Sequence, residues 1–374
     1  MLDCPHQGRC GGCPWGGQRP SAQRAAKVAA LASAWSAADL PPLPALTLRP
    51  LPYGAPARDR ADLRLLDRGA TIGLLGEGGA LVDIDACALM SPALAPLYTR
   101  LRADPPPLPR ASLRLRVSPS GRLGLWIDLA NLDCLALLQE GAWLRRWTEA
   151  RVVVELGQKR KRALPLGEEA DGFKLSEPEL RPWTESWLLA DPRQGASSPV
   201  RAAPIYQAVG SFSQPGHAAN RALHALVGDL LPEGPLGRVI EWGAGAGNFT
   251  LPLAQRSKSV VAIESEPLSR AGLDRSLHEA GLQAKVTVRD KADSLDADLL
   301  FVDPPRSGIG PLLPLLAATE APPATLFYLA CAGEALVRDA VTLAARGYRP
   351  VAAGGLDQFP HSAHAEWAVT FRRG

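Results

Sequence analysis

Two patterns of hydrophobic and polar positions follow each other along the chain. Between about Ala61 and Leu156, short segments alternate apolar with polar residues, and Gly and Pro turns separate them; this is typical of half-buried strands. After about Ala202, apolar segments alternate with helical stretches, which predicts βαβ units and a parallel sheet. We therefore expect an α+β domain with a mostly antiparallel sheet over residues 1–200 and a doubly wound α/β domain over residues 201–374.

Individual elements follow from the same patterns. A helix is expected over Ala22–Ala38, followed by a Pro-rich linker. Strands of the first domain are expected at Ala61–Leu65, Ser112–Val117 and Arg151–Glu155. Those of the second are expected at Arg238–Glu241, Ser259–Ile263, Asp298–Val302 and Thr325–Leu329, with a final antiparallel strand at Ala365–Arg372. Ligands bind beyond the carboxyl ends of parallel strands, so the residues that follow these strands are where chemistry is expected.

Composition narrows the class of protein. With 46% hydrophobic and 21% charged residues, the chain has the balance of a globular protein. It shows no apolar run of the roughly 20 residues that a membrane helix needs and no signal peptide at its start. We therefore expect a cytoplasmic protein without a membrane partner, whose six cysteines serve as ligands or catalysts rather than as disulfides.

Charge alone does not identify a partner. The formal net charge is only +3, but basic residues cluster at Arg110–Arg116 and at Lys159–Arg162. Arginine suits bidentate contacts to phosphate and stacking on bases. An ordinary solvated surface would have the same composition.

A glycine-rich turn follows the first strand of the second domain. It reads Glu241-Trp-Gly243-Ala-Gly245-Ala-Gly247-Asn248, with Glu264 after the next strand. Glycines let the backbone turn sharply and approach a ligand, and a carboxylate after the second strand suits a ribose diol. The acidic residue that opens the loop and the absence of the G-x-G-x-x-G fingerprint favour S-adenosylmethionine over a dinucleotide. The cofactor-binding residues expected here are Gly243, Gly245, Asn248 and Glu264, together with Asp303 after the fourth strand.

Three side chains are expected at one edge of this sheet. Asp303 and Cys331 each follow a parallel strand, and Glu366 begins the antiparallel one. A thiolate that adds to carbon 6 of uracil makes carbon 5 nucleophilic towards a sulfonium methyl, and a base must then remove the carbon-5 proton. Cysteine suits the first role and a shielded carboxylate the second.

Longer motifs resemble a known family, the RNA 5-methyluridine methyltransferases that act on 23S rRNA and tRNA. The resemblance covers nearly the whole chain and is carried by Phe212-Ser-Gln214-Pro-Gly-His-Ala-Ala-Asn220, by Asp303-Pro-Pro-Arg-Ser-Gly308 and by Asp357-Gln-Phe-Pro-His361-Ser-Ala-His364-Ala-Glu366. It implies a Rossmann-like class I methyltransferase domain after an α+β iron–sulfur and RNA-binding domain. It also implies Cys331 as nucleophile, Glu366 as base and Gln214 as a cofactor contact.

The N-terminal cysteines also match this family. Cys4, Cys10 and Cys13 are similar to its iron–sulfur motif, and Cys87 matches the distant fourth ligand. The resemblance implies a [4Fe–4S] cluster, although four thiolates also suit zinc and the spacing does not choose the metal. Because the printed chain begins at this motif, we expect the branch without a small N-terminal RNA-binding barrel. Its partner would be RNA, with 23S rRNA favoured over tRNA, and the protein is expected to be a monomer.

Some residues depart from the family pattern. The family has Ser-Cys-Asn-Pro around the nucleophile, where this chain has Ala330-Cys331-Ala332-Gly333. Gly216 stands in place of an Asn, and Gly243 in place of an aromatic residue. Three alternatives therefore remain beside the main interpretation: a tRNA 5-methyluridine enzyme, a 5-methylcytosine enzyme, and a catalytically weakened RNA-binding relative.

Overall fold

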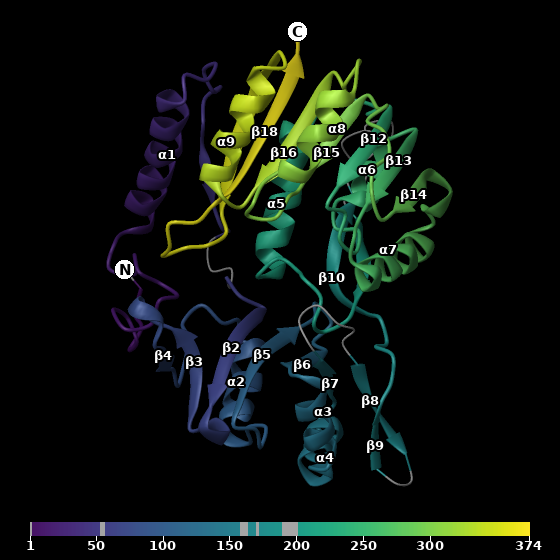
Figure 1. Cartoon of the computed structure of the whole chain (residues 1–374). Coiled ribbons are helices and arrows are strands. Elements are labelled where there is room, and N and C mark those ends of the chain that lie inside the picture. The colour runs from purple at the N-terminus through teal and green to yellow at the C-terminus, as the bar shows by residue number, and fades with distance from the viewer. Residues whose placement is uncertain (1, 53–56, 158–163, 170–171, 189–200) are drawn as a thin grey trace. The chain divides into compact units, whose positions relative to one another are not determined.

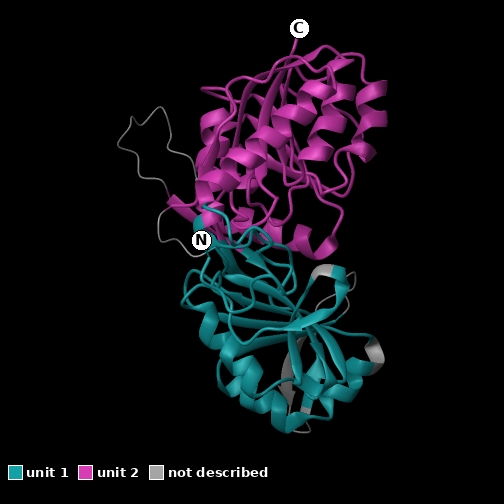
Figure 2. Cartoon of the chain, turned by 90° about the vertical axis from the view of Figure 1, so that its left-hand side faces the viewer, with its two compact units in different colours: residues 1–19, 54–184, 206–218 teal, residues 20–53, 185–205, 219–374 magenta. Residues whose placement is uncertain are grey.

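The computed structural model describes residues 2–52, 57–157, 164–169, 172–188 and 201–374. They form two compact units, which Figure 2 shows in different colours. Unit 1 consists of Met1–Arg19, Gly54–Thr184 and Tyr206–Ala218, and unit 2 of Pro20–Tyr53, Glu185–Ile205 and Ala219–Gly374. The hydrophobic pattern predicted a single boundary near residue 200. The segments of the two units instead alternate along the chain.

Packing explains why residues 20–53 belong to unit 2. Helix α1 (Pro20–Ala37) agrees with the predicted helix and places Leu31 and Trp35 in the core of unit 2. Strand β1 (Leu48–Pro50) then pairs in parallel with β17 (Tyr348–Asp357) at the edge of the unit 2 sheet. The Pro-rich segment between them thus connects two elements of one unit.

Unit 1 is built on a sheet of eight described strands, in the order β4-β3-β2-β5-β6-β7-β8-β9. Every neighbouring pair is antiparallel except β6 and β7, so the expectation of a mostly antiparallel sheet is confirmed. The strands are β2 (Arg60–Leu66), β3 (Thr71–Leu75), β4 (Leu81–Asp83), β5 (Arg110–Val117), β6 (Leu123–Asp128), β7 (Val152–Gly157), β8 (Leu164–Glu169) and β9 (Gly172–Leu175).

Alternation along these strands builds the core of unit 1. In β2, Ala61, Leu63 and Leu65 are buried while the residues between them are not. Helices α2 (Leu94–Ala103), α3 (Asn131–Leu138) and α4 (Gly141–Glu149) contribute apolar side chains to the same core. Helices α3 and α4 also make the crossover that the parallel pair β6 and β7 requires.

Unit 2 contains the predicted parallel sheet. Its order is β1-β17-β18-β16-β15-β12-β13-β14, and β18 is antiparallel to both of its neighbours, as the sequence predicted. Figure 1 shows these strands side by side in the upper part of the view. The remaining strands are β12 (Arg238–Trp242), β13 (Ser259–Ile263), β14 (Val286–Arg289), β15 (Leu299–Val302), β16 (Thr325–Ala330) and β18 (Glu366–Arg373).

Two hydrophobic clusters show that helices cover both faces of this sheet. One cluster takes residues from α5 (His217–Leu230), α6 (Thr250–Arg256) and α7 (Pro267–Ala280), and the other from α1, α8 (Leu313–Ala318) and α9 (Gly333–Ala344). Such a three-layer, doubly wound arrangement leaves the carboxyl ends of the parallel strands as the place for a ligand.

Two further strands, β10 (Arg181–Leu188) and β11 (Arg201–Gln207), pair with each other. Within the described residues, no helix combines the length and the apolar character that crossing a bilayer requires.

Candidate active site

Register brings the ends of the parallel strands of unit 2 to one edge. Trp242 at the end of β12 is aligned with Ile263 at the end of β13 and with Val302 at the end of β15. Strand β16 ends at Ala330, which is opposite Trp367 of the antiparallel β18. Residues that follow the parallel strands and the residue that begins β18 therefore meet at this edge.

Cys331 lies at this edge among two carboxylates and a guanidinium. Burial raises the pKa of the Cys331 thiol, and the nearby carboxylates of Glu366 and Asp303 raise it further. Arg306 opposes them through its charge and a hydrogen bond to the thiol. Because electrostatic effects of this kind require proximity, the structure brings together the three side chains that the sequence placed at one rim.

Glu366 is 4% exposed. Burial and the charge of Asp303 raise the pKa of Glu366 to about 8, against a hydrogen bond that Gln358 Nε2 donates to its Oε1 at 2.7 Å. Burial alone raises the pKa of Asp303 to about 7. A carboxylate whose pKa lies near neutrality is suited to taking a proton from a substrate.

The glycine-rich loop takes a backbone conformation that favours glycine. Gly243, Gly245 and Gly247 have φ angles of 88°, 57° and 106°. A Cβ on Gly243 would come within 2.5 Å of the Asp303 carbonyl oxygen, whereas a Cβ on Gly245 would meet open space. A side chain at 243 would therefore require this backbone to shift, and the open space beside Gly245 fits a ligand that approaches the backbone.

Glu264 is tied to this loop. Its Oε2 accepts a hydrogen bond from Gly245 N at 2.9 Å, and its Oε1 accepts one from Glu266 N at 2.7 Å. A carboxylate has about four acceptor sites, so two backbone donors leave capacity for hydroxyl groups. Its contact with a ribose stays a prediction.

The side-chain amide of Asn248 forms hydrogen bonds to other side chains of the protein. Its Oδ1 lies 3.0 Å from Asn220 Nδ2 and 3.1 Å from His224 Nε2, and its Nδ2 donates to Asn220 Oδ1 at 2.9 Å. Burial lowers the pKa of His224 to about 4, so this imidazole is neutral. The amide thus links α5 to the start of α6, and its predicted contact with a cofactor is not tested by this geometry.

Glu241, which opens the loop, is a functional candidate to which the sequence gave no separate role. It is 1% exposed, and burial raises its pKa to about 8. A hydrogen bond with Thr250 lowers this pKa, and the charges of Asp303 and Glu264 raise it further. The buried carboxyl group is thus bonded inside the protein, at the start of α6.

Gln214 belongs to unit 1, in the segment between β11 and α5. Arginines of β2 and β5 hold the backbone of this segment: Arg60 donates to Ser213 O, Arg114 to the Gly210 and Ser211 carbonyls, and Arg116 to Ala208 O. Its contact with a cofactor stays a prediction.

Part of the basic cluster at Arg110–Arg116 is therefore structural. Arg116 is 1% exposed, and its guanidinium is used inside unit 1. The second cluster, Lys159–Arg162, lies outside the described residues.

Cys4, Cys10, Cys13 and Cys87 line one small cavity in unit 1. Burial raises the pKa of Cys13 to about 11; Arg58 lowers it, and the other three cysteines raise it further. No group of three or more His, Cys, Asp or Glu side chains in the described part of the chain has the arrangement of a metal site. The structure thus brings the four predicted cysteines to one cavity without ligand geometry.

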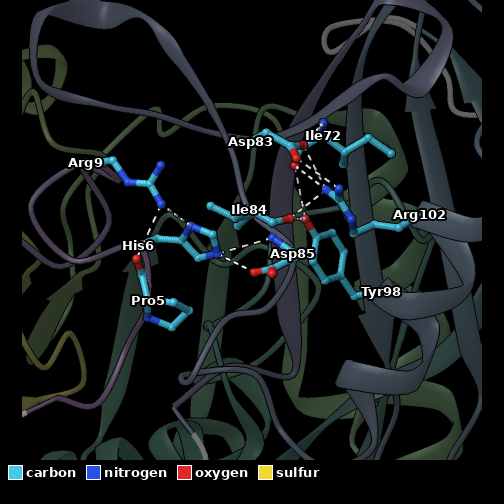
Figure 3. A network of polar contacts seen from close by, with 9 residues as sticks. All are labelled: Pro5, His6, Arg9, Ile72, Asp83, Ile84, Asp85, Tyr98 and Arg102. Carbon is cyan, nitrogen blue, oxygen red and sulfur yellow. Dashed lines mark hydrogen bonds and ion pairs between the residues drawn. The ribbon is translucent and has the colours of Figure 1, made fainter.

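Polar contacts join the two segments that carry these cysteines, as Figure 3 shows. His6 Nε2 lies 2.5 Å from Asp85 Oδ1, and Arg9 contacts the other ring nitrogen of His6 at 3.3 Å. Arg102 holds Asp83 through two hydrogen bonds of 2.8 and 2.9 Å. The first segment is thereby fixed to the second by contacts that need no metal.

Known proteins resemble the chain along its length. An uncharacterized RNA methyltransferase of Bdellovibrio bacteriovorus is 37% identical, over 98% of this chain and 94% of that protein. The 23S rRNA (uracil(1939)-C(5))-methyltransferase RlmD of Chromohalobacter salexigens is 32% identical, over 99% of this chain and 76% of that protein. The chain belongs to the RNA (uracil-C5) methyltransferases. No family model matches it.

A solved structure supports the fold of this RNA (uracil-C5) methyltransferase. The Pyrococcus abyssi tRNA (uracil-54, C5)-methyltransferase, in complex with S-adenosyl-L-homocysteine, superposes with a TM-score of 0.68 at 19% identity, over 98% of this chain and 86% of that one. The predicted Rossmann-like class I methyltransferase fold is confirmed. So is the predicted enzyme class, an S-adenosylmethionine-dependent RNA (uracil-C5) methyltransferase.

Two contributors to the site were missed although their motifs were recognised. Arg306 lies in the Asp303-Pro-Pro-Arg306 motif and Gln358 in the motif that ends at Glu366. Their spacing could have pointed to the site, but only contacts to Cys331 and Glu366 give them a role.

Proposed function

We propose that this enzyme methylates carbon 5 of a uridine in 23S rRNA, with Cys331 as covalent nucleophile and Glu366 as general base. The observation that carries this proposal is the meeting of Cys331, Glu366 and Asp303 at one edge of the sheet, where the two carboxylates raise the pKa of the thiol and Asp303 raises that of Glu366. A thiol and a carboxylate in one water-poor site are what the reaction needs.

The steps follow from these two side chains. The Cys331 thiolate adds its Sγ to carbon 6 of the uracil, and the electron pair displaced toward carbon 5 attacks the methyl group of the donor, whose sulfonium leaves as a neutral thioether. Glu366 then accepts the carbon-5 proton, the bond between Sγ and carbon 6 breaks, and the ring double bond returns. Arg306, which hydrogen-bonds the thiol, favours the thiolate before attack and after elimination.

The loop Gly243–Gly247 and Glu264 are proposed to hold S-adenosylmethionine, with Asp303 beside them. Two features support this: the open space beside Gly245 and the acceptor capacity of Glu264. Removal of Glu264 would leave ribose hydroxyls without a partner, at a cost of roughly 1–3 kcal/mol. Calorimetry of Glu264→Ala that shows unchanged affinity for the donor would remove Glu264 from the site.

An RNA–protein adduct tests the mechanism directly. Glu366→Gln should attack and transfer the methyl group and then stall before elimination, since only the proton acceptor is lost. Its complex with RNA should survive a denaturing gel and carry the labelled methyl group. A Glu366→Gln variant that turns over normally, without any trapped complex, would overturn the assignment of the base.

The choice of 23S rRNA is supported by the curated relatives, several of which are named as 23S rRNA (uracil(1939)-C(5))-methyltransferases. A cytoplasmic location and a monomeric state stay predictions from the sequence. Nucleoside mass spectrometry of rRNA and tRNA from a deletion strain is the test. Loss of 5-methyluridine from tRNA alone would favour the tRNA alternative.

A [4Fe–4S] cluster is proposed for the cavity lined by Cys4, Cys10, Cys13 and Cys87. Four soft thiol ligands at one cavity support this cluster by their chemistry. Bound there, it would tie the N-terminal segment to the segment at Cys87. Protein purified without oxygen should contain about four irons per chain and absorb near ~400 nm. One zinc per chain and no iron would replace the cluster with a zinc site.

A further inference from the structure

Helix α1 contacts the segment that leads to Glu366, although the two lie far apart in the sequence. Figure 1 shows the purple α1 beside the yellow C-terminal elements. The helix buries Gln23, Lys27, Leu31 and Trp35, which are spaced four residues apart on one face. The two apolar members pack in the core of unit 2. Burial of a lysine costs free energy unless the lysine is paired and hydrogen-bonded. Contacts of Lys27 and Gln23 inside the protein must therefore offset the cost of burying these two polar side chains.

Lys27 holds the backbone on both sides of Gln358. Its Nζ donates to Asp357 Oδ1 at 2.6 Å and to Phe359 O at 3.1 Å. The Lys27 and Asp357 side chains are 1% and 4% exposed. An ion pair this deeply buried is screened little by solvent, so the backbone around Gln358 is held in place from the helix.

Gln23 holds the next turn of the same segment. Its Oε1 accepts a hydrogen bond from His361 N at 2.9 Å, and its Nε2 lies 3.1 Å from His361 Nδ1. His361 has a φ angle of 66°, in the left-handed region that residues other than glycine rarely occupy. Such a conformation persists only where surrounding contacts maintain it, and Gln23 supplies two of them.

Gln358 connects the backbone segment that α1 fixes to the proposed base, Glu366. Its Nε2 donates to Glu366 Oε1 at 2.7 Å, and both side chains are buried. Leu356, two residues before Gln358, is also aligned with Glu366 across β17 and β18. The position of the carboxylate therefore depends on the backbone that α1 fixes.

We propose that Lys27 and Gln23 are positioning residues for the general base Glu366, acting through Gln358. This inference rests on the proposed role of Glu366. Neither residue is hydrogen-bonded to Cys331 or Glu366, so we expect their substitution to act mainly on proton removal from carbon 5. Attack by Cys331 and transfer of the methyl group precede that step and need no carboxylate at 366.

The test separates adduct formation from elimination in a single turnover with labelled methyl donor and RNA. Lys27→Met leaves Asp357 buried without its partner and can fail to fold, so the double variant Lys27→Met/Asp357→Leu is measured with it. Replacing both members of a buried ion pair by apolar residues commonly preserves stability. Gln23→Leu is the milder variant. Lys285→Met is the matched control, because Lys285 Nζ also donates to two carbonyls of unit 2, those of Ala254 and Ser257.

We expect elimination to slow by about tenfold to a hundredfold in the Lys27 variants, as for a misplaced catalytic group. Methylated, denaturation-resistant RNA–protein complex should accumulate while its rate of formation stays within about twofold. Gln23→Leu should show the same effect more weakly, and Lys285→Met should show none.

Two outcomes would overturn the inference. In the first, the double variant folds and no complex accumulates; in the second, formation and elimination slow equally, as general loosening of the fold would cause. Glu366→Gln, measured in parallel, distinguishes a failure of the proposed function from a failure of the positioning role. If Glu366→Gln itself traps no complex, the proposed function fails; if it traps the complex and the Lys27 variants do not, only the positioning role fails.

Discussion

Cys331 of unit 2 and Cys13 of unit 1 occupy similar physical settings with different neighbours. Burial is the main cause that raises the pKa of each thiol, and one arginine lowers it in each case, Arg306 for Cys331 and Arg58 for Cys13. Around Cys331 the other charges are the carboxylates of Glu366 and Asp303. Around Cys13 they are only the three other cysteines.

This difference agrees with the two purposes proposed for cysteine in this chain. A thiol beside a carboxylate can attack a substrate, because the carboxylate can then accept the proton that must leave before the thiol is released. No carboxylate is among the described residues that line the cavity of the four cysteines. Thiolates gathered there repel one another and are stabilised by a bound cation. Neighbouring charges, rather than burial, therefore distinguish the proposed nucleophile from the proposed ligands.

The largest expected effect is on catalysis. Cys331→Ala should lower methyl transfer by at least about a thousandfold, because the covalent route is lost, and should leave iron content unchanged. Transfer of labelled methyl groups to RNA measures the loss. Cys134→Ala is the control, since Cys134 is buried in the core of unit 1 and does not line the cavity of the four cysteines. Methylation by Cys331→Ala near the unmutated rate would end the covalent mechanism.

Cys87→Ser should act on the other site. We expect loss of the iron and a fall in the free energy of unfolding of more than about 2 kcal/mol, because metal binding is coupled to folding. Iron analysis and thermal unfolding measure the two effects, with Cys134→Ser as the variant that keeps the iron. A Cys87→Ser protein with full iron content would exclude Cys87 as a ligand.

Much of the catalytic site could be predicted because strand ends fix positions. Asp303 and Cys331 follow buried apolar strands, and Glu366 begins an antiparallel one, so the topology alone brings them to one edge. Helix α1 was predicted, but not its unit, because the periodicity of a helix does not say which sheet it covers. Strand β14 was missed because Val286–Arg289 is short and only partly buried.

Charge patterns were a weaker guide than strand ends. The sequence shows Arg114 and Arg116 as part of a basic cluster, and the structure shows that both donate to carbonyls of the segment 208–211. An arginine that holds backbone and an arginine that awaits phosphate look alike in a sequence. Gln358 was passed over for a similar reason, since its role depends on one contact with Glu366.

The pH dependence of turnover should report the carboxylate neighbours of Cys331. Burial and Asp303 raise the pKa of Glu366 to about 8, so at pH 6 the base is largely protonated and inactive. Deprotonation of Glu366 alone should therefore raise turnover by up to about tenfold per pH unit from pH 6 to pH 8. The raised pKa of the Cys331 thiol makes the rise steeper and carries it beyond pH 8. Turnover that falls over this range would contradict Glu366 as the base.

Arg306 and Arg58 provide a matched pair of smaller changes. Arg306→Gln removes the cation that lowers the pKa of Cys331, so we expect turnover at pH 7 to fall by about threefold to tenfold, with partial recovery at higher pH. Arg58→Gln removes the corresponding cation beside Cys13 and should leave the pH profile of turnover unchanged. Identical pH profiles for both variants would show that Arg306 does not act on the thiol.

The smallest expected effect comes from Ala332, which separates Cys331 from helix α9. Ala332 is the N-cap of α9, with φ −134° and ψ 112°, and makes no side-chain cap hydrogen bond. Its extended conformation is the one that Asn adopts at an N-cap, and Asn there is commonly worth about 1 kcal/mol over Ala. Ala332→Asn should therefore raise the free energy of unfolding by about this amount in a denaturant titration.

The better-ordered start of helix α9 also presents its partial positive charge to Cys331 more firmly, which favours the thiolate. Turnover of Ala332→Asn should therefore rise by about twofold or less. Ala332→Ser can cap the helix without an amide group. If Asn and Ser stabilise the fold equally but only Asn increases turnover, the amide acts on the bound base rather than on the helix. If neither stabilises the fold, the cap is already satisfied in another way.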